Sequence, residues 1–192
     1  MNHTTAATAF DPRPTASVAE PEHRLGLESI RRRGYLLTAG AITWAVTIFA
    51  FGPTSGGAEG RVGDLGGAAF QRGLFAVLSV MLATGATGVT RAARAMIRVE
   101  FVLLGLATTW SVLHAVVPAS LQEAPWLMAL DLFWPLSMVG MFVIGVKVAF
   151  AGRWQGVLRW WPMVAESWAF VTIPWMMVCG ELGSPIVGGT HL

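Results

Sequence analysis

Long apolar runs with almost no charged residues constrain the fold of this chain more than any other feature of its sequence. The runs lie at about residues 35–51, 70–90, 97–117, 126–150 and 157–179. A helix needs roughly 20 apolar residues to cross the ~30 Å hydrocarbon core of a bilayer, and strands of this composition would leave backbone groups unpaired in lipid. The sequence therefore predicts an all-α integral membrane protein, a bundle of about five transmembrane helices.

Charge is scarce throughout the chain. Of its 192 residues, 54% are hydrophobic and 12% are charged, which is about half of the ~25% charged residues in an ordinary soluble domain. The formal net charge is only +2, and the basic residues stand near the ends of the predicted helices. We therefore expect the chain to contact membrane lipid and to bind no nucleic acid.

The distribution of the basic residues predicts the orientation in the membrane. If the N-terminus lies in the cytoplasm, only Arg61 and Arg72 fall outside, and every other basic residue falls inside or at the inner helix ends. This positive-inside bias predicts N-terminus in and C-terminus out, and it supports an odd number of spans. The predicted cytoplasmic residues are Arg13, Arg24, Arg31, Arg32, Arg33, Arg91, Arg94, Arg98, Lys147, Arg153 and Arg159.

The segments outside the apolar runs give the rest of the predicted organisation. Residues 1–34 are polar and rich in proline, so we expect a largely disordered cytoplasmic segment. Residues 35–180 form the transmembrane domain, and residues 181–192 form a short external tail. A cleaved signal peptide is the alternative for the first run, but the long polar segment before it favours a retained helix. The glycines of residues 52–69 predict a flexible external loop.

Arginine is strongly preferred over lysine in this sequence. Lys147 is the single lysine, and alanine and glycine are abundant. This bias is typical of a GC-rich coding genome. We therefore expect a bacterial protein of the inner (plasma) membrane.

Four ionisable residues lie within the apolar runs: Glu100, His114, Asp131 and Glu166. Ionisable residues inside a membrane are rare and usually face a bundle interior or a water-filled cavity. These four residues are therefore the candidate polar site of the protein.

Glu100 and His114 share one face of the predicted third helix, since intervals of seven residues make about two turns each. In one interpretation they are the two ends of a polar seam, with Glu100 at the cytoplasmic end and His114 at the outer end. In the other, each lies near the lipid headgroups and pairs locally. Asp131 falls at the depth of His114, so the two could pair, or Asp131 could bond an indole or a backbone amide. Pro135, one turn further on, should kink the fourth helix.

The predicted fifth helix carries Trp161, Trp168 and Trp175 at intervals of seven residues. Trp168 lies two positions after Glu166, which corresponds to a rotation of about 200° around the helix. We therefore expect the tryptophan face to meet lipid or a partner, and Glu166 to face the bundle. There Glu166 either handles protons or substrate, or makes a structural hydrogen bond. The depth of Trp168 also suggests a helix contact.

No catalytic, cofactor-binding or metal-binding motif occurs in the sequence. Cys179 is the single cysteine, so it can form neither an internal disulfide nor a CxxC pair. His114 is the only histidine within a predicted span, whereas haem held by two histidines needs two. Asp131 has no second intramembrane aspartate with which to form a protease dyad. We therefore expect no enzymatic activity, no cofactor and no metal.

Two classes of function are favoured over a third, an enzyme that acts on lipid or another apolar substrate. The missing motifs and the short loops favour a non-enzymatic membrane subunit, scaffold or regulator that binds another membrane protein. The alternative is a small proton-linked transporter or exporter, which would use Glu166, Asp131 and His114. Five helices lack two equal halves that could rock against each other, so such a transporter would act as a homo-oligomer.

Overall fold

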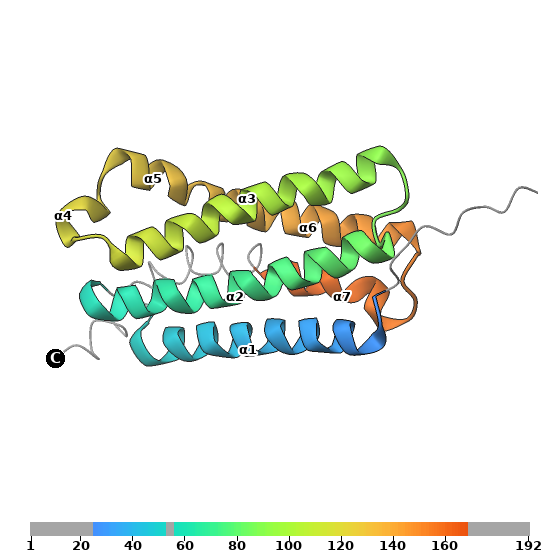
Figure 1. The fold of residues 1–192 in the computed structure, drawn as a ribbon, viewed down its shortest axis with the longest axis horizontal. Coiled ribbons are helices and arrows are strands. Elements are labelled where there is room, and N and C mark those ends of the chain that lie inside the picture. Colours follow the sequence, from blue (N-terminus) through green and yellow to red (C-terminus); the bar gives the residue numbers. More distant parts are fainter. Residues whose placement is uncertain (1–24, 53–55, 169–192) are drawn as a thin grey trace, which may run out of the picture.

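The computed structural model describes residues 25–52 and 56–168, and every regular element in these ranges is an α-helix (Figure 1). The elements are α1 (Leu27–Phe51), α2 (Gly57–Thr84), α3 (Arg91–Val116), α4 (Ala119–Gln122), α5 (Pro125–Asp131), α6 (Phe133–Ala151) and α7 (Val157–Glu166).

Four helical segments are long and apolar enough to cross a membrane: α1, α2, α3, and α5 together with α6. The predicted helical, membrane-compatible architecture is therefore confirmed. The predicted fifth span, 157–179, begins with α7, and its second part lies outside the described residues. The same holds for the first 24 residues and for the predicted tail at 181–192.

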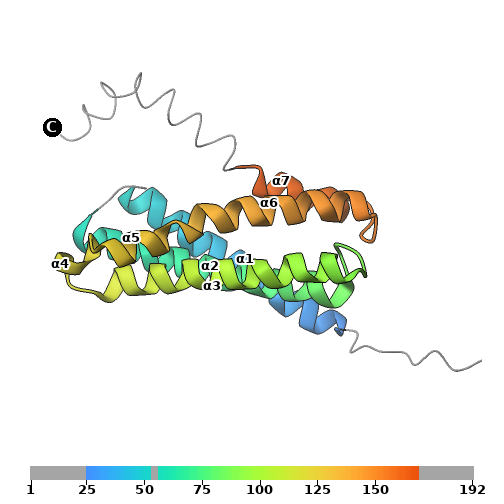
Figure 2. The same cartoon turned by 90° about the horizontal axis from the view of Figure 1, so that it is seen from above.

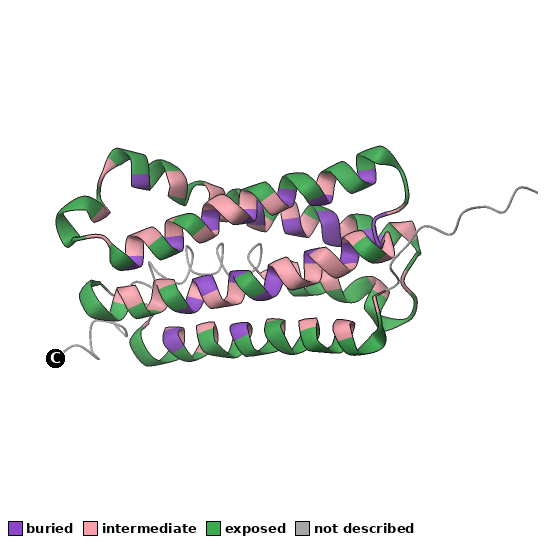
Figure 3. Ribbon diagram, in the orientation of Figure 1, coloured by how far each residue is buried: buried purple, intermediate pink, exposed green. Residues whose placement is uncertain are grey.

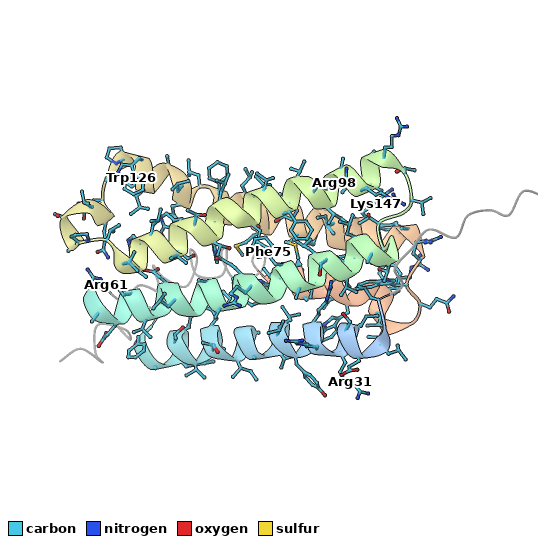
Figure 4. The ribbon with its side chains drawn as sticks, in the orientation of Figure 1. Arg31, Arg61, Phe75, Arg98, Trp126 and Lys147 are labelled. Atoms are coloured by element: carbon cyan, nitrogen blue, oxygen red, sulfur yellow. The ribbon has the colours of Figure 1, made fainter. Side chains whose placement is uncertain are left out.

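Successive long helices run in opposite directions, so the start of α1, the α2–α3 turn and the α6–α7 turn share one end of the bundle (Figures 1 and 2). Arg31, Arg98 and Lys147 lie toward this end, whereas Arg61 lies at the opposite end (Figure 4). For these four residues the asymmetry of charge agrees with the prediction, whereas Arg72, which was predicted to lie outside, is near the middle of α2. The side of the membrane on which each end lies stays a prediction.

The glycine-rich segment differs from its prediction, because α2 already begins at Gly57. The predicted loop at 52–69 is therefore wrong for residues 57–69. A Cβ added to Gly66 would lie 2.7 Å from Thr47 Oγ1, and one added to Gly73 would lie 2.6 Å from Leu37 Cα. On α1, a Cβ at Gly40 would lie 2.5 Å from the Ala69 carbonyl oxygen. The glycines therefore allow close helix packing.

Besides α2, two further helices begin earlier than the apolar runs predict. Helix α1 starts at Leu27, and Arg33 within it donates a hydrogen bond to Ser79 Oγ of α2. Helix α3 starts at Arg91, where Thr90 Oγ1 accepts a hydrogen bond from the Ala93 N–H. Arginines at a helix end can extend their charged groups toward the membrane surface, so a helix can continue past its apolar run.

The predicted kink in the fourth helix occurs as an interruption between α5 and α6. Helix α5 ends at Asp131, and α6 begins at Phe133. Pro135 lacks the N–H that would bond to the Asp131 carbonyl one turn earlier. The interruption therefore follows from the sequence.

The helices pack mainly in chain order: α1 on α2, α2 on α3, α3 on α5 and α6, and α6 on α7. Gly145 allows the last contact, because a Cβ there would lie 2.8 Å from the Met163 nitrogen. The buried core follows α2, α3 and α6, while α1 exposes most of its surface (Figure 3). The core includes Leu78, Met81, Ile97, Leu104, Ile144 and Val148.

Candidate polar site inside the helix bundle

Glu100 of α3 is buried against α6, with only 1% of its surface exposed. The Ser137 hydroxyl donates a 2.5 Å hydrogen bond to Glu100 Oε1. A Cβ added to Gly140, one turn after Ser137, would lie 1.9 Å from Glu100 Oε2. Gly140 therefore leaves the space that the carboxylate occupies, and Ser137 orients it.

The prediction that Glu100 lies at the cytoplasmic end of its span stays a prediction, but the helix itself begins nine residues before it, at Arg91. Helix α3 has 26 residues, which corresponds to a length of about 39 Å at 1.5 Å per residue. Glu100 lies roughly 14 Å from its start at Arg91. Its partner Ser137 lies near the middle of the span Pro125–Ala151. The early start of α3 thus moves this carboxylate toward the centre of the bundle.

Glu166 lies at the end of α7 and lines a cavity between α2, α3, α6 and the end of α7. The prediction that Glu166 faces the bundle agrees with this position. Glu166 and Glu100 are close enough for their charges to interact, and the Ser137 side chain, which bonds to Glu100, lines the same cavity. Glu166 therefore lines the cavity itself, whereas Glu100 adjoins it through its bond to Ser137.

The cavity has an empty volume of about 340 Å³, part of which is open to the surroundings. The smaller volume that the centre of a water molecule can occupy inside it is about 20 Å³. A site for one water molecule needs roughly 10–15 Å³ of this smaller volume, so the cavity has room for water or a compact ligand. Leucine and methionine side chains complete the wall. The polar and aromatic lining residues are Phe70, Gln71, Trp134, Ser137, Glu166 and Trp168.

Gln71 is a site residue that the sequence analysis did not identify. It is 1% exposed, and its Oε1 accepts a 3.3 Å hydrogen bond from Ser111 Oγ of α3. Its Nε2 is buried without a hydrogen-bond partner within residues 25–52 and 56–168. Buried polar groups are almost always paired, so this N–H of a residue that lines the cavity is free to donate to a water molecule or a ligand. The signal that could have found Gln71 is its spacing of seven residues from Asp64, which places both side chains on one face of a helix. The prediction of a loop at residues 57–69 hid this signal.

His114 bonds to Asp64 of α2, with Nδ1 and Oδ2 2.6 Å apart. Asp131 is exposed and lies only within electrostatic range of the pair. Of the two alternatives for Asp131, the pair with His114 is therefore not the one observed, and the actual partner, Asp64, lies in the segment that was predicted as the glycine loop. The cluster lies at the end of the bundle where Arg61 donates a 3.0 Å hydrogen bond to the Val117 carbonyl.

The inner face of α3 therefore carries three polar contacts in succession: His114 with Asp64, Ser111 with Gln71, and Glu100 with Ser137. We call these six residues the polar seam. It starts at one end of the bundle and reaches its interior, and the cavity adjoins its two deeper pairs.

The tryptophan stripe is only partly as predicted. Trp161 is 60% exposed, as expected for a face that meets lipid. Trp168 instead lines the cavity beside Glu166 and packs edge-on against Trp44 of α1, with ring centroids 5.6 Å apart. The predicted rotation assumes a continuous helix, whereas α7 ends at Glu166. The helix contact predicted for Trp168 is confirmed, and Trp175 lies outside the described residues.

Comparisons with protein-family models, with curated proteins and with solved structures found no match to this chain. Among the described side chains, no group of three His, Cys, Asp or Glu could hold a metal ion. The chemistry of the site therefore has to be derived from its own residues.

Proposed function

We propose that this chain is a non-enzymatic, multi-pass membrane protein that acts as a small proton-linked transporter. One observation carries the proposal: Glu166, Gln71 and Ser137, which bonds to Glu100, line one cavity between the helices. Ionisable residues within membrane spans commonly form ion paths, substrate sites and proton relays.

The polar seam supplies a path between the cavity and one end of the bundle. Ser111 and Glu100 are separated along α3 by about 16 Å at 1.5 Å per residue, and the cavity lies between them against Leu104. A proton or cation that enters beside His114 and Asp64 would pass Ser111 and Gln71 and reach Glu166. The Ser137 hydroxyl then links it to Glu100.

The rest of the proposal concerns assembly and location. The five spans that the sequence predicts cannot divide into two equal halves that alternate around a central site, so we propose that the chain works as a homo-oligomer in the inner membrane of a bacterium, with its N-terminus in the cytoplasm. The role of a subunit that binds another membrane protein stays the competing proposal, and a stable heteromeric complex in native membranes would favour it.

Proton flux into liposomes tests the transporter proposal. Purified protein is reconstituted around a pH-sensitive dye, and a potassium diffusion potential drives proton entry. We expect flux above that of protein-free liposomes, and a fall to that background in both Glu166→Gln and Glu100→Gln. Glu123→Gln makes the same chemical change at an exposed residue outside the cavity and should retain full flux. Wild-type protein without flux, or both cavity variants with wild-type flux, would refute the proposal.

A further inference from the structure

Aromatic rings cluster on the wall of the cavity beside Glu166. Phe70, Trp134 and Trp168 line the cavity, and Trp44 of α1 packs against all three rings. Its centroid lies 5.1 Å from that of Phe70, 6.2 Å from that of Trp134 and 5.6 Å from that of Trp168. The aromatic cluster therefore joins α1, α2, α6 and the end of α7 around one space.

We propose that this cavity binds a small alkylammonium ion. The carboxylate of Glu166 accepts hydrogen bonds from the ammonium group, and the alkyl part contacts the rings of Phe70, Trp134 and Trp168. Aromatic faces attract cations through their negative quadrupole, with tryptophan the most effective. The inference rests on the proposed function in one respect: this ion is the solute that the protein transports.

The charge of the site selects a cation. Glu166 lines the cavity and Glu100 lies within electrostatic range of it, whereas no arginine or lysine is among the lining residues. An anion would therefore meet two carboxyl groups and no compensating charge. A cation replaces lost hydration with a carboxylate and with aromatic faces.

The size and the remaining polar group narrow the ligand further. The cavity holds little more than one water-sized molecule, so a short alkyl group suits it better than a long one. The side-chain oxygen of Gln71 accepts a hydrogen bond from Ser111. Its side-chain nitrogen is buried without a partner in the part of the chain described. An amide offers both donors and an acceptor, so this group can bond to a water molecule that the ammonium ion carries into the site.

Intrinsic tryptophan fluorescence measures binding directly, because Trp134 and Trp168 line the cavity. Wild-type protein in lipid nanodiscs is titrated with methylammonium chloride and, separately, with sodium chloride at equal ionic strength. We expect a saturable change with methylammonium and none with sodium. An equal response to both salts, or no saturable change with methylammonium, would overturn the inference, and neither result depends on a variant that has to fold.

Variants then assign the site. Glu166→Gln should weaken methylammonium binding by at least about tenfold, since it removes the charge, and Glu123→Gln should leave it unchanged. Binding that survives in folded Glu166→Gln protein would contradict the assigned site. Proton flux without methylammonium binding would remove the alkylammonium inference and leave the proposed function standing. Methylammonium binding without proton flux would refute the proposed function and leave the alkylammonium site standing.

Discussion

The substitution Gly140→Ala tests the packing of Glu100 most sharply. The new Cβ would lie 1.9 Å from Glu100 Oε2 and 3.0 Å from its Cδ. The carboxylate must therefore retreat by more than about 1 Å to reach ordinary van der Waals distance. Because Glu100 is buried and bonded to Ser137, this movement breaks the hydrogen bond or displaces α6.

The expected cost follows from three contributions. A hydrogen bond inside a membrane protein contributes about 0.6–1.7 kcal/mol, and overpacking costs about 1–3 kcal/mol. Alanine gains about 1 kcal/mol over glycine in a helix. Gly140→Ala should therefore destabilise the protein by about 1–3 kcal/mol. Gly105→Ala is the matched control, because the nearest atom to its Cβ would be Phe75 Cζ at 4.0 Å, and it should be neutral or mildly stabilising.

The assay is unfolding in mixed micelles by increasing SDS, followed by tryptophan fluorescence. A double-mutant cycle isolates the clash, since in the Glu100→Ala background the new Cβ at position 140 meets no carboxylate. Gly140→Ala should then stabilise by about 1 kcal/mol, the gain of alanine over glycine, which gives a coupling of about 2–4 kcal/mol between the two positions. Gly140→Ala protein as stable as Gly105→Ala protein, or a coupling near zero, would show that the carboxylate does not occupy this space.

Two further predictions use the same unfolding assay. Gly40→Ala should destabilise the protein by about 1–3 kcal/mol, because its Cβ would lie 2.5 Å from the Ala69 carbonyl oxygen of α2. Gly34→Ala is the control and should not destabilise it, since no atom lies within 4 Å of the new Cβ. Equal effects of the two substitutions would contradict the packing of α1 on α2. Asp64→Asn should cost about 1 kcal/mol of stability by weakening the bond to His114, whereas Asp131→Asn should change stability by less than about 0.5 kcal/mol. A larger loss in Asp131→Asn than in Asp64→Asn would show that Asp131 is the partner of His114.

The helical, membrane-compatible architecture could be predicted because it depends on composition over long windows. The interior position of Glu166 and the interruption before Pro135 could also be predicted, since each follows from local helix geometry. The helix starts could not, because arginines and glycines lower the apolar count of a segment without preventing a helix.

The partners of the polar residues could not be predicted for the same reason. Residues 57–69 have the composition of a flexible loop, yet their glycines pack against α1 and keep the segment helical. Only a helical segment brings Asp64 alongside His114, and only the register between α2 and α3 brings Gln71 to Ser111. Contacts between helices depend on that register, which a single sequence does not specify.

The initial rate of proton entry into liposomes, compared between wild-type and Glu166→Gln protein, tests the central claim most directly. The claim is that the carboxylate of Glu166, in a cavity next to the Glu100–Ser137 pair, carries protons across the membrane. The account predicts flux with wild-type protein and none above protein-free liposomes with the variant. Equal flux in the two proteins would contradict it.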